Sequence, residues 1–99
     1  MDIKLINHGE EGELLLIGRL DTNTAPDAEK AMFSTTERFD TLVLNMEKLE
    51  YVSSAGLRVL KRVHVAMRKK GGKLLCKNVG KMVMEVFEVT GFAGMLKFI

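Results

Sequence analysis

The chain has 99 residues, a length that suits one compact domain with a hydrophobic core of its own. Hydrophobic residues make up 46% of the sequence and charged residues 28%, and both values are ordinary for a globular protein. The formal net charge is only +2, which excludes a strong field for nucleic acid over the whole molecule but allows a local basic patch.

The single cysteine, Cys76, can form no intramolecular disulfide and no metal cluster by itself. Its apolar neighbours predict a small buried core residue. No apolar stretch has the length of a membrane span, and residues 1–4 lack the pattern of a signal peptide. We therefore expect a cytoplasmic protein without membrane insertion, bound metal or cofactor.

The first two predicted elements form a hairpin. Residues 3–7 alternate between apolar and polar, as a half-buried strand does. Residues 13–20 contain a continuous apolar run that is short enough for a buried strand. The polar, glycine-flanked residues 8–12 lie between them, so the two strands are predicted to be antiparallel neighbours.

A helix and a third strand are predicted next. Asp21, Thr22, Asn23 and Thr24 are capping residues, and Pro26 suits the first turn of a helix over residues 25–39. Residues 41–46 read as an apolar strand, and residues 47–50 as a loop.

The second predicted helix follows two serines, Ser53 and Ser54, either of which is a good N-cap. Its apolar face contains Leu57, Leu60, Val63, His64 and Met67. Residues 71–72 (Gly-Gly) predict a left-handed end to this helix.

The rest of the chain predicts a strand at residues 73–77, a helix at residues 81–89 that stops at Thr90-Gly91, and a short strand at residues 96–99. The order is β-β-α-β-α-β-α-β. We therefore predict a single α/β domain over residues 1–99, with a four- to five-stranded, mostly parallel sheet, one antiparallel edge strand and helices packed on the sheet.

Few residues offer catalytic chemistry. His8 lies in a polar turn, and His64 lies too far along the second helix to contact Ser54. No phosphate-binding loop with a Gly-Lys-Ser/Thr run is present. We expect no enzyme and no catalytic residue, although a hydroxyl at a helix N-terminus can itself carry a phosphate.

Basic residues gather on and after the second helix. They suit either a solvated helix face or a surface for an acidic partner or an anionic lipid. No aromatic residues are interleaved with them, which argues against single-stranded nucleic acid. The basic residues are Arg58, Lys61, Arg62, Arg68, Lys69, Lys70 and Lys73.

Five segments match, in order and spacing, the motifs of one known family. They are residues 18–21 (Gly-Arg-Leu-Asp), 42–46 (Leu-Val-Leu-Asn-Met), 51–57 (Tyr-Val-Ser-Ser-Ala-Gly-Leu), 71–74 and 87–92. Together they span nearly the whole chain. On this basis the sequence resembles the STAS superfamily and, within it, the small bacterial anti-sigma factor antagonists.

The resemblance implies a phosphorylation site. When the motifs are aligned on Gly56 and Leu57, the family's phosphorylated serine falls on Ser54. The aspartate that precedes it in the family is replaced by Ser53, which leaves Ser53 as a rival acceptor. The family usually ends in a further helix, whereas this chain stops at Ile99. Part of the sheet is therefore expected to be less covered, or to be covered by another chain.

The resemblance also implies partner switching. The unphosphorylated protein would bind an anti-sigma factor that is a serine kinase, phosphorylation would release it, and a PP2C-type phosphatase would reset it. The alternative is a stand-alone subunit that docks on a lipid or anion transporter assembly. The expected partner-binding residues are Asp21, Thr22, Thr24, Tyr51, Ser53, Ser54, Ala55, Gly56, Leu57, Arg58 and Lys61.

Overall fold

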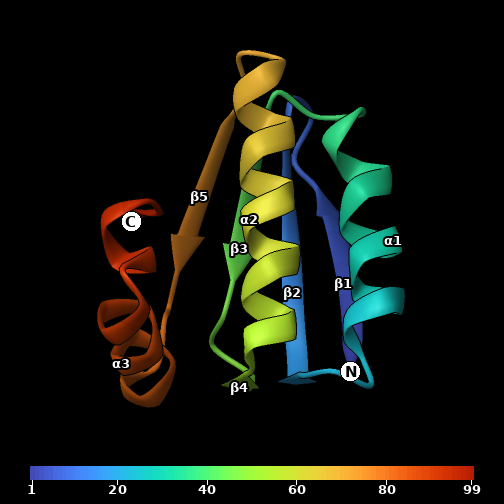
Figure 1. The fold of residues 1–99 in the computed structure, drawn as a ribbon. Coiled ribbons are helices and arrows are strands. Elements are labelled where there is room, and N and C mark those ends of the chain that lie inside the picture. Colours follow the sequence, from blue (N-terminus) through green and yellow to red (C-terminus); the bar gives the residue numbers. More distant parts are fainter.

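The computed structural model describes residues 1–99 as a sheet with its first two helices over one face and its third helix toward one edge (Figure 1). None of the helices has the length and apolar character that crossing a bilayer requires. The elements are β1 (Asp2–Asn7), β2 (Glu11–Leu20), α1 (Ala25–Thr36), β3 (Thr41–Asn45), β4 (Leu49–Val52), α2 (Ser54–Lys69), β5 (Lys73–Lys77), α3 (Lys81–Thr90), a 3-10 turn (Phe92–Gly94) and β6 (Lys97–Phe98).

The sheet has the strand order β1-β2-β3-β5-β6, and β4 pairs with the far end of β2. Only β1 and β2 are antiparallel, and the pairs β2–β3, β3–β5, β5–β6 and β2–β4 are all parallel. The predicted fold class is thus confirmed, including the N-terminal hairpin. The sheet has six strands, because β4 joins the strands that the sequence predicted.

β4 corrects the prediction of a loop over residues 47–50. Residues 11–15 of β2 pair with β3, and residues 18–20 pair with β4 after a register shift at Gly18. Gly18 has a φ of 105°, a backbone conformation that glycine adopts without strain. Because of this shift, the long strand β2 pairs first with β3 and then with β4, both of which are shorter.

α1 ends at Thr36, three residues earlier than predicted. The hydroxyl of Thr36 donates a hydrogen bond to the carbonyl of Phe33, and Lys70 Nζ donates to the carbonyls of Thr36 and Phe39. The bonds to Phe33 and Thr36 satisfy carbonyls of the last helical turn, and the bond to Phe39 holds the residues that follow the helix. Phe39 leaves the helix but stays buried, and its ring packs on Gly12, where a Cβ would lie only 2.7 Å from the ring.

The helix ends that the glycines predicted are confirmed. Gly71 follows α2 with a φ of 76°, and Gly91 ends α3 with a φ of 83°. Both are in the left-handed region where a helix commonly terminates on glycine.

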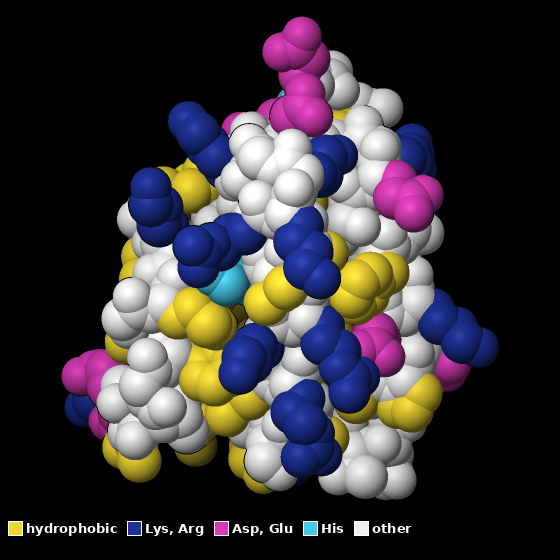
Figure 2. Space-filling model, turned by 45° about the horizontal axis from the view of Figure 1, so that its top comes forward, with side chains coloured by type: hydrophobic (Ala, Val, Ile, Leu, Met, Phe, Trp, Pro, Cys, Tyr) yellow, Lys and Arg dark blue, Asp and Glu magenta, His cyan; other side chains and the backbone are white.

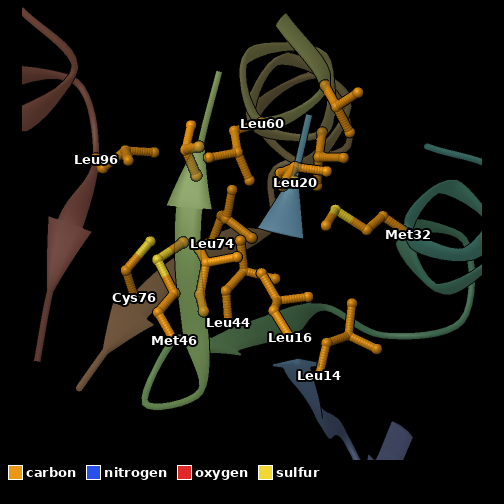
Figure 3. Close-up of a cluster of buried hydrophobic side chains, with 14 of the residues drawn as sticks. Leu14, Leu16, Leu20, Met32, Leu44, Met46, Leu60, Leu74, Cys76 and Leu96 are labelled. Carbon is orange, nitrogen blue, oxygen red and sulfur yellow. The ribbon is translucent and has the colours of Figure 1, made fainter. Parts of the chain in front are cut away.

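The hydrophobic core lies between the sheet and the helices, in one cluster of 22 buried residues (Figure 3). Alternate residues of β2, β3 and β5 enter it, among them Leu16, Leu44 and Cys76. Cys76 is fully buried, as predicted, and burial raises the pKa of its thiol to about 12. From α2 the cluster receives Leu60 and the other predicted apolar residues, except that His64 is only half-buried.

The opposite face of the sheet contains a polar group that the sequence did not predict. Glu13 is only 8% exposed, and its carboxylate accepts a hydrogen bond from Asn45 Nδ2 at 2.9 Å. His8 Nε2 lies 3.0 Å from Glu13 Oε1, and Lys77 Nζ lies 3.3 Å from Glu13 Oε2. The hydrogen bonds from Asn45 and then His8 hold the pKa of Glu13 below its usual value, although burial opposes them.

Candidate functional site: the turn between β4 and α2

Ser53 forms the cap of α2. Its backbone is extended, with φ −95° and ψ 177°, and its Oγ accepts a hydrogen bond from the N–H of Gly56 at 3.3 Å. Its own N–H donates to the carbonyl of Leu20, and its carbonyl accepts from Leu57 N–H, both at 2.9 Å. The half-buried Ser53 therefore fixes the start of the helix, as predicted for one of the two serines.

Ser54 occupies a different environment. It is the first residue of the 16-residue helix α2 and is exposed. No side-chain hydrogen bond holds its hydroxyl, in contrast to that of Ser53. The positive end of the helix dipole and the free N–H groups of the first turn lie beside this hydroxyl, so a negative charge placed on it would be stabilised.

Gly56 allows α2 to approach the end of β2 closely. A Cβ at this position would lie 2.7 Å from both the Cγ and the backbone oxygen of Leu20. Leu57 follows it and is only 7% exposed. Both residues were predicted to contact a partner. In the structure both are buried on the interior side of the turn, whereas Ser54 and Tyr51 are exposed on its outer surface.

The loop from Asp21 to Thr24 lies next to the turn, because Leu20 pairs with Val52 across β2 and β4. The carboxylate of Asp21 accepts hydrogen bonds from the N–H groups of Asn23 at 3.0 Å and Thr24 at 3.2 Å. The bond from the N–H of Thr24 is the largest cause that lowers the pKa of Asp21. The loop is thus held by its own hydrogen bonds, and Thr22 is left exposed.

Arg19 connects this loop with the turn. Its guanidinium carbon lies 4.3 Å from the centre of the Tyr51 ring, and its Nε lies 3.7 Å from Asp21 Oδ2. Arg19 was not among the predicted site residues, although it stands inside the family-like motif at residues 18–21. The parallel pairing of β2 with β4 places Arg19 opposite Tyr51, and the sequence did not reveal this pairing because residues 47–50 were predicted as a loop.

Apart from the buried Gly56 and Leu57, the predicted residues fall into two groups. One group surrounds the turn and contains the Asp21–Thr24 loop, Tyr51, Ser53, Ser54 and Ala55. The other lies on the solvent side of α2, where Arg58 and Lys61 line a hollow between α2 and α1. Lys61 comes seven residues after Ser54, about 10 Å further along the helix axis.

The site is thus an exposed hydroxyl at a helix start, beside a rigid loop and a basic helix face. No three His, Cys, Asp or Glu side chains anywhere in the chain are grouped to hold a metal ion. Fold and site together define a small α/β domain that presents an exposed surface turn at one end of its sheet. The chain belongs to the STAS domain family, whose model matches residues 5–99.

The curated proteins with sequences similar to this chain include two anti-sigma factor antagonists. The putative anti-sigma factor antagonist BtrV of Bordetella bronchiseptica is 43% identical over 51 residues, which are 52% of this chain and 44% of that protein. The anti-sigma-B factor antagonist of Bacillus subtilis is 25% identical over 76 residues, which are 77% of this chain and 70% of that protein. The match with BtrV thus spans less than half of that protein's length.

The fold is similar to that of a solved structure, the Bacillus cell fate determinant SpoIIAA in its phosphorylated form. The TM-score is 0.75 at 17% sequence identity, over 99% of this chain and 91% of that one. The unphosphorylated form of SpoIIAA gives a TM-score of 0.76 at 16% identity, over 99% of this chain and 87% of that one. At these identities the similarity shows a shared fold.

Proposed function

We propose that this chain is an anti-sigma factor antagonist that works by partner switching. When Ser54 is unmodified, the turn and the Asp21–Thr24 loop bind an anti-sigma factor that is also a serine kinase. Phosphorylation of Ser54 releases that partner, and a PP2C-type phosphatase restores the hydroxyl. The chain itself acts as a binding protein and phosphate acceptor, not as an enzyme, and its output is sigma-factor-dependent transcription.

One observation carries the proposal: the two adjacent serines have different roles. Ser53 Oγ is occupied as an acceptor in the cap of α2, whereas the exposed hydroxyl of Ser54 has no partner within the protein. A kinase can reach Ser54 without first breaking a structural hydrogen bond. This supports Ser54 over its rival Ser53. The names of the two curated relatives and the phosphorylated form of SpoIIAA support the class of mechanism.

A phosphate on Ser54 can supply the free energy needed to release the partner. A phosphate adds about −1.5 to −2 charge units to a surface that otherwise packs against the partner. If repulsion and desolvation cost about 3 kcal/mol, binding weakens on the order of a hundredfold. The fold need not change, because the free N–H groups and dipole at the start of α2 stabilise the new charge.

The test uses the anti-sigma factors of the source genome, purified singly and incubated with this protein and ATP. Ser54→Ala should abolish phosphate incorporation, measured by peptide mass spectrometry, and leave binding intact by calorimetry. Ser54→Asp should weaken binding, by up to about a hundredfold if the charge reproduces the effect of the phosphate.

Ser34 supplies a matched control, because it is exposed on α1 and away from the turn. Ser34→Asp adds the same charge as Ser54→Asp and should bind like the wild type. Incorporation of phosphate into the Ser54→Ala protein at Ser53 would keep the mechanism and move the site. Wild-type binding by both Ser54 variants would refute switching at Ser54 and favour a constitutive docking role.

A further inference from the structure

A groove runs along α2 on the side that faces α1. It has a volume of about 530 Å³, and Phe33 of α1 forms one wall. From α2 the lining residues are Arg58, Lys61, Arg62, Val65, Ala66 and Lys69. Figure 2 shows this side of the molecule: Lys and Arg side chains form a band with hydrophobic side chains between them, and the acidic side chains lie mostly toward the margins.

The cations of this groove are largely without ionic partners. Arg62 pairs with Glu29 at 2.6 Å, but none of the protein's ion pairs includes Arg58, Lys61 or Lys69. No carboxylate lines the groove itself. The groove therefore keeps an uncompensated positive charge in a molecule whose net charge is only +2.

The spacing of the lining residues forms a stripe along one side of α2. Residues 58, 61, 62, 65 and 69 recur every three or four positions, so they line one side of the helix over about three turns, or about 16 Å. Val65 is 38% exposed and Phe33, in the opposite wall, is half-buried, so apolar side chains lie among the cations. This stripe begins one turn after Ser54, so it continues from the surface of the proposed switch.

We propose that this groove binds an acidic amphipathic helix of the partner protein. Apolar side chains of that helix would lie on Phe33 and Val65, and its carboxylates would pair with Arg58, Lys61 and Lys69. This is the arrangement in which an amphipathic helix lies in a groove, with charge complementarity setting its orientation. The inference rests on the proposed function, because it names the chemistry of the same partner beyond the Ser54 turn.

The shape of the surface favours a protein segment over a lipid bilayer. Membrane-surface helices insert an apolar face into the bilayer and keep their cations at its rim. Here the apolar face of α2 is buried in the core, and the groove offers only three apolar side chains among its four cations. A helix can place its own apolar side chains on these few and its carboxylates on the cations, whereas this surface has no broad apolar face to insert into a bilayer.

The first experiment titrates a synthetic peptide of about 16 residues, the length of the groove with one extra turn, into the full 15N-labelled chain. Its leucines form one helical stripe and its glutamates flank them. The amide signals of Phe33, Val65 and Lys69 should shift on binding. The double variant Lys61→Glu/Lys69→Glu should weaken binding at least about tenfold, and added salt should weaken it in the wild type.

Two control experiments distinguish binding in the groove from attraction by net charge. The double variant Lys4→Glu/Lys81→Glu changes the net charge equally at exposed positions of β1 and α3 and should bind the peptide like the wild type. A peptide of the same composition with its leucines scattered around the helix should bind weakly. Equal binding of both peptides would show attraction by net charge alone and would overturn the proposal.

A lipid surface is tested in parallel, with vesicles of phosphatidylcholine containing about one third phosphatidylserine. If Lys61 and Lys69 were needed for vesicle binding but not for peptide binding, the groove would be a membrane site and the proposal would fail. The peptide experiment does not involve Ser54, and the phosphorylation experiment does not involve Lys69. Failure of one therefore leaves the other interpretable.

Discussion

At the scale of single residues, Gly56 decides how closely the functional turn approaches the sheet. In most helices a change from Gly to Ala stabilises, by about 1 kcal/mol. Here the added Cβ would lie 2.7 Å from the backbone oxygen of Leu20, an atom that cannot move aside as the end of a side chain does. Steric overlap should therefore outweigh the gain in helix propensity.

We expect Gly56→Ala to lower the free energy of unfolding by about 1 to 3 kcal/mol, the usual cost of overpacking a tight site. Urea unfolding followed by circular dichroism measures it. Gly94→Ala is the matched control, because no atom lies within 4 Å of a Cβ at Gly94. A Gly56→Ala protein as stable as the Gly94→Ala protein would mean that α2 can shift freely, and that Gly56 does not set its position.

At the scale of elements, the two serines at the start of α2 should contribute differently to the stability of the protein. Ser53→Ala removes the oxygen that accepts from the N–H of Gly56 and should cost about 1 kcal/mol of stability. Ser54→Ala removes a hydroxyl without a partner and adds a good helix former, so its effect on stability should stay within about 0.5 kcal/mol.

Thermal and urea unfolding of the two single variants test this difference. The result also controls the phosphorylation experiment, because it shows that loss of phosphate in Ser54→Ala does not arise from unfolding. The opposite order, with Ser54→Ala the less stable protein, would show that Ser54 is the cap and would make Ser53 the better acceptor.

Some elements were predictable because the residues that determine them lie close together in the sequence. The hairpin follows from two strands around a glycine-flanked turn, and the ends of α2 and α3 follow from Gly71 and Gly91. β4 was not predictable by this means. It has four residues, of which only the first and last are buried, and it exists because β2 continues past β3 after the shift at Gly18.

The candidate site likewise has features that the sequence reveals and features that only the fold reveals. The sequence placed the two serines at a helix start, but the choice of cap depends on the extended backbone of Ser53, which a sequence pattern does not reveal. The cations of α2 were visible as a cluster. The groove that they line was not, because its opposite wall is Phe33, 25 residues before Arg58 in the chain.

At the scale of the whole molecule, the two faces of the sheet are stabilised by different means. The helix-covered face holds the hydrophobic cluster, whereas the opposite face is held in part by the hydrogen bonds around Glu13. These bonds join the β1–β2 hairpin through His8, β3 through Asn45 and β5 through Lys77. Three strands of the sheet, β2, β3 and β5, are thus linked through one carboxylate.

This carboxylate makes the stability of the fold depend on pH. The hydrogen bonds from Asn45 and His8 lower the pKa of Glu13 in the folded chain below its value in the unfolded chain. The contribution is therefore complete above the ordinary carboxyl pKa, and it is lost as the pH falls through the lowered folded value. Acid should loosen the uncovered face of the sheet as Glu13 becomes protonated.

The substitution Glu13→Gln tests this directly. At neutral pH the variant should be less stable by about 1 to 3 kcal/mol, because hydrogen bonds to a charged acceptor become bonds to a neutral one. The gap to the wild type should shrink as the pH falls, since protonation removes the same charge from the wild type. Urea unfolding at a series of pH values measures it, with the exposed Glu10→Gln as control. A gap that stayed constant from neutral to acidic pH would mean that Glu13 contributes through packing and shape, and that its charge does not hold the sheet together.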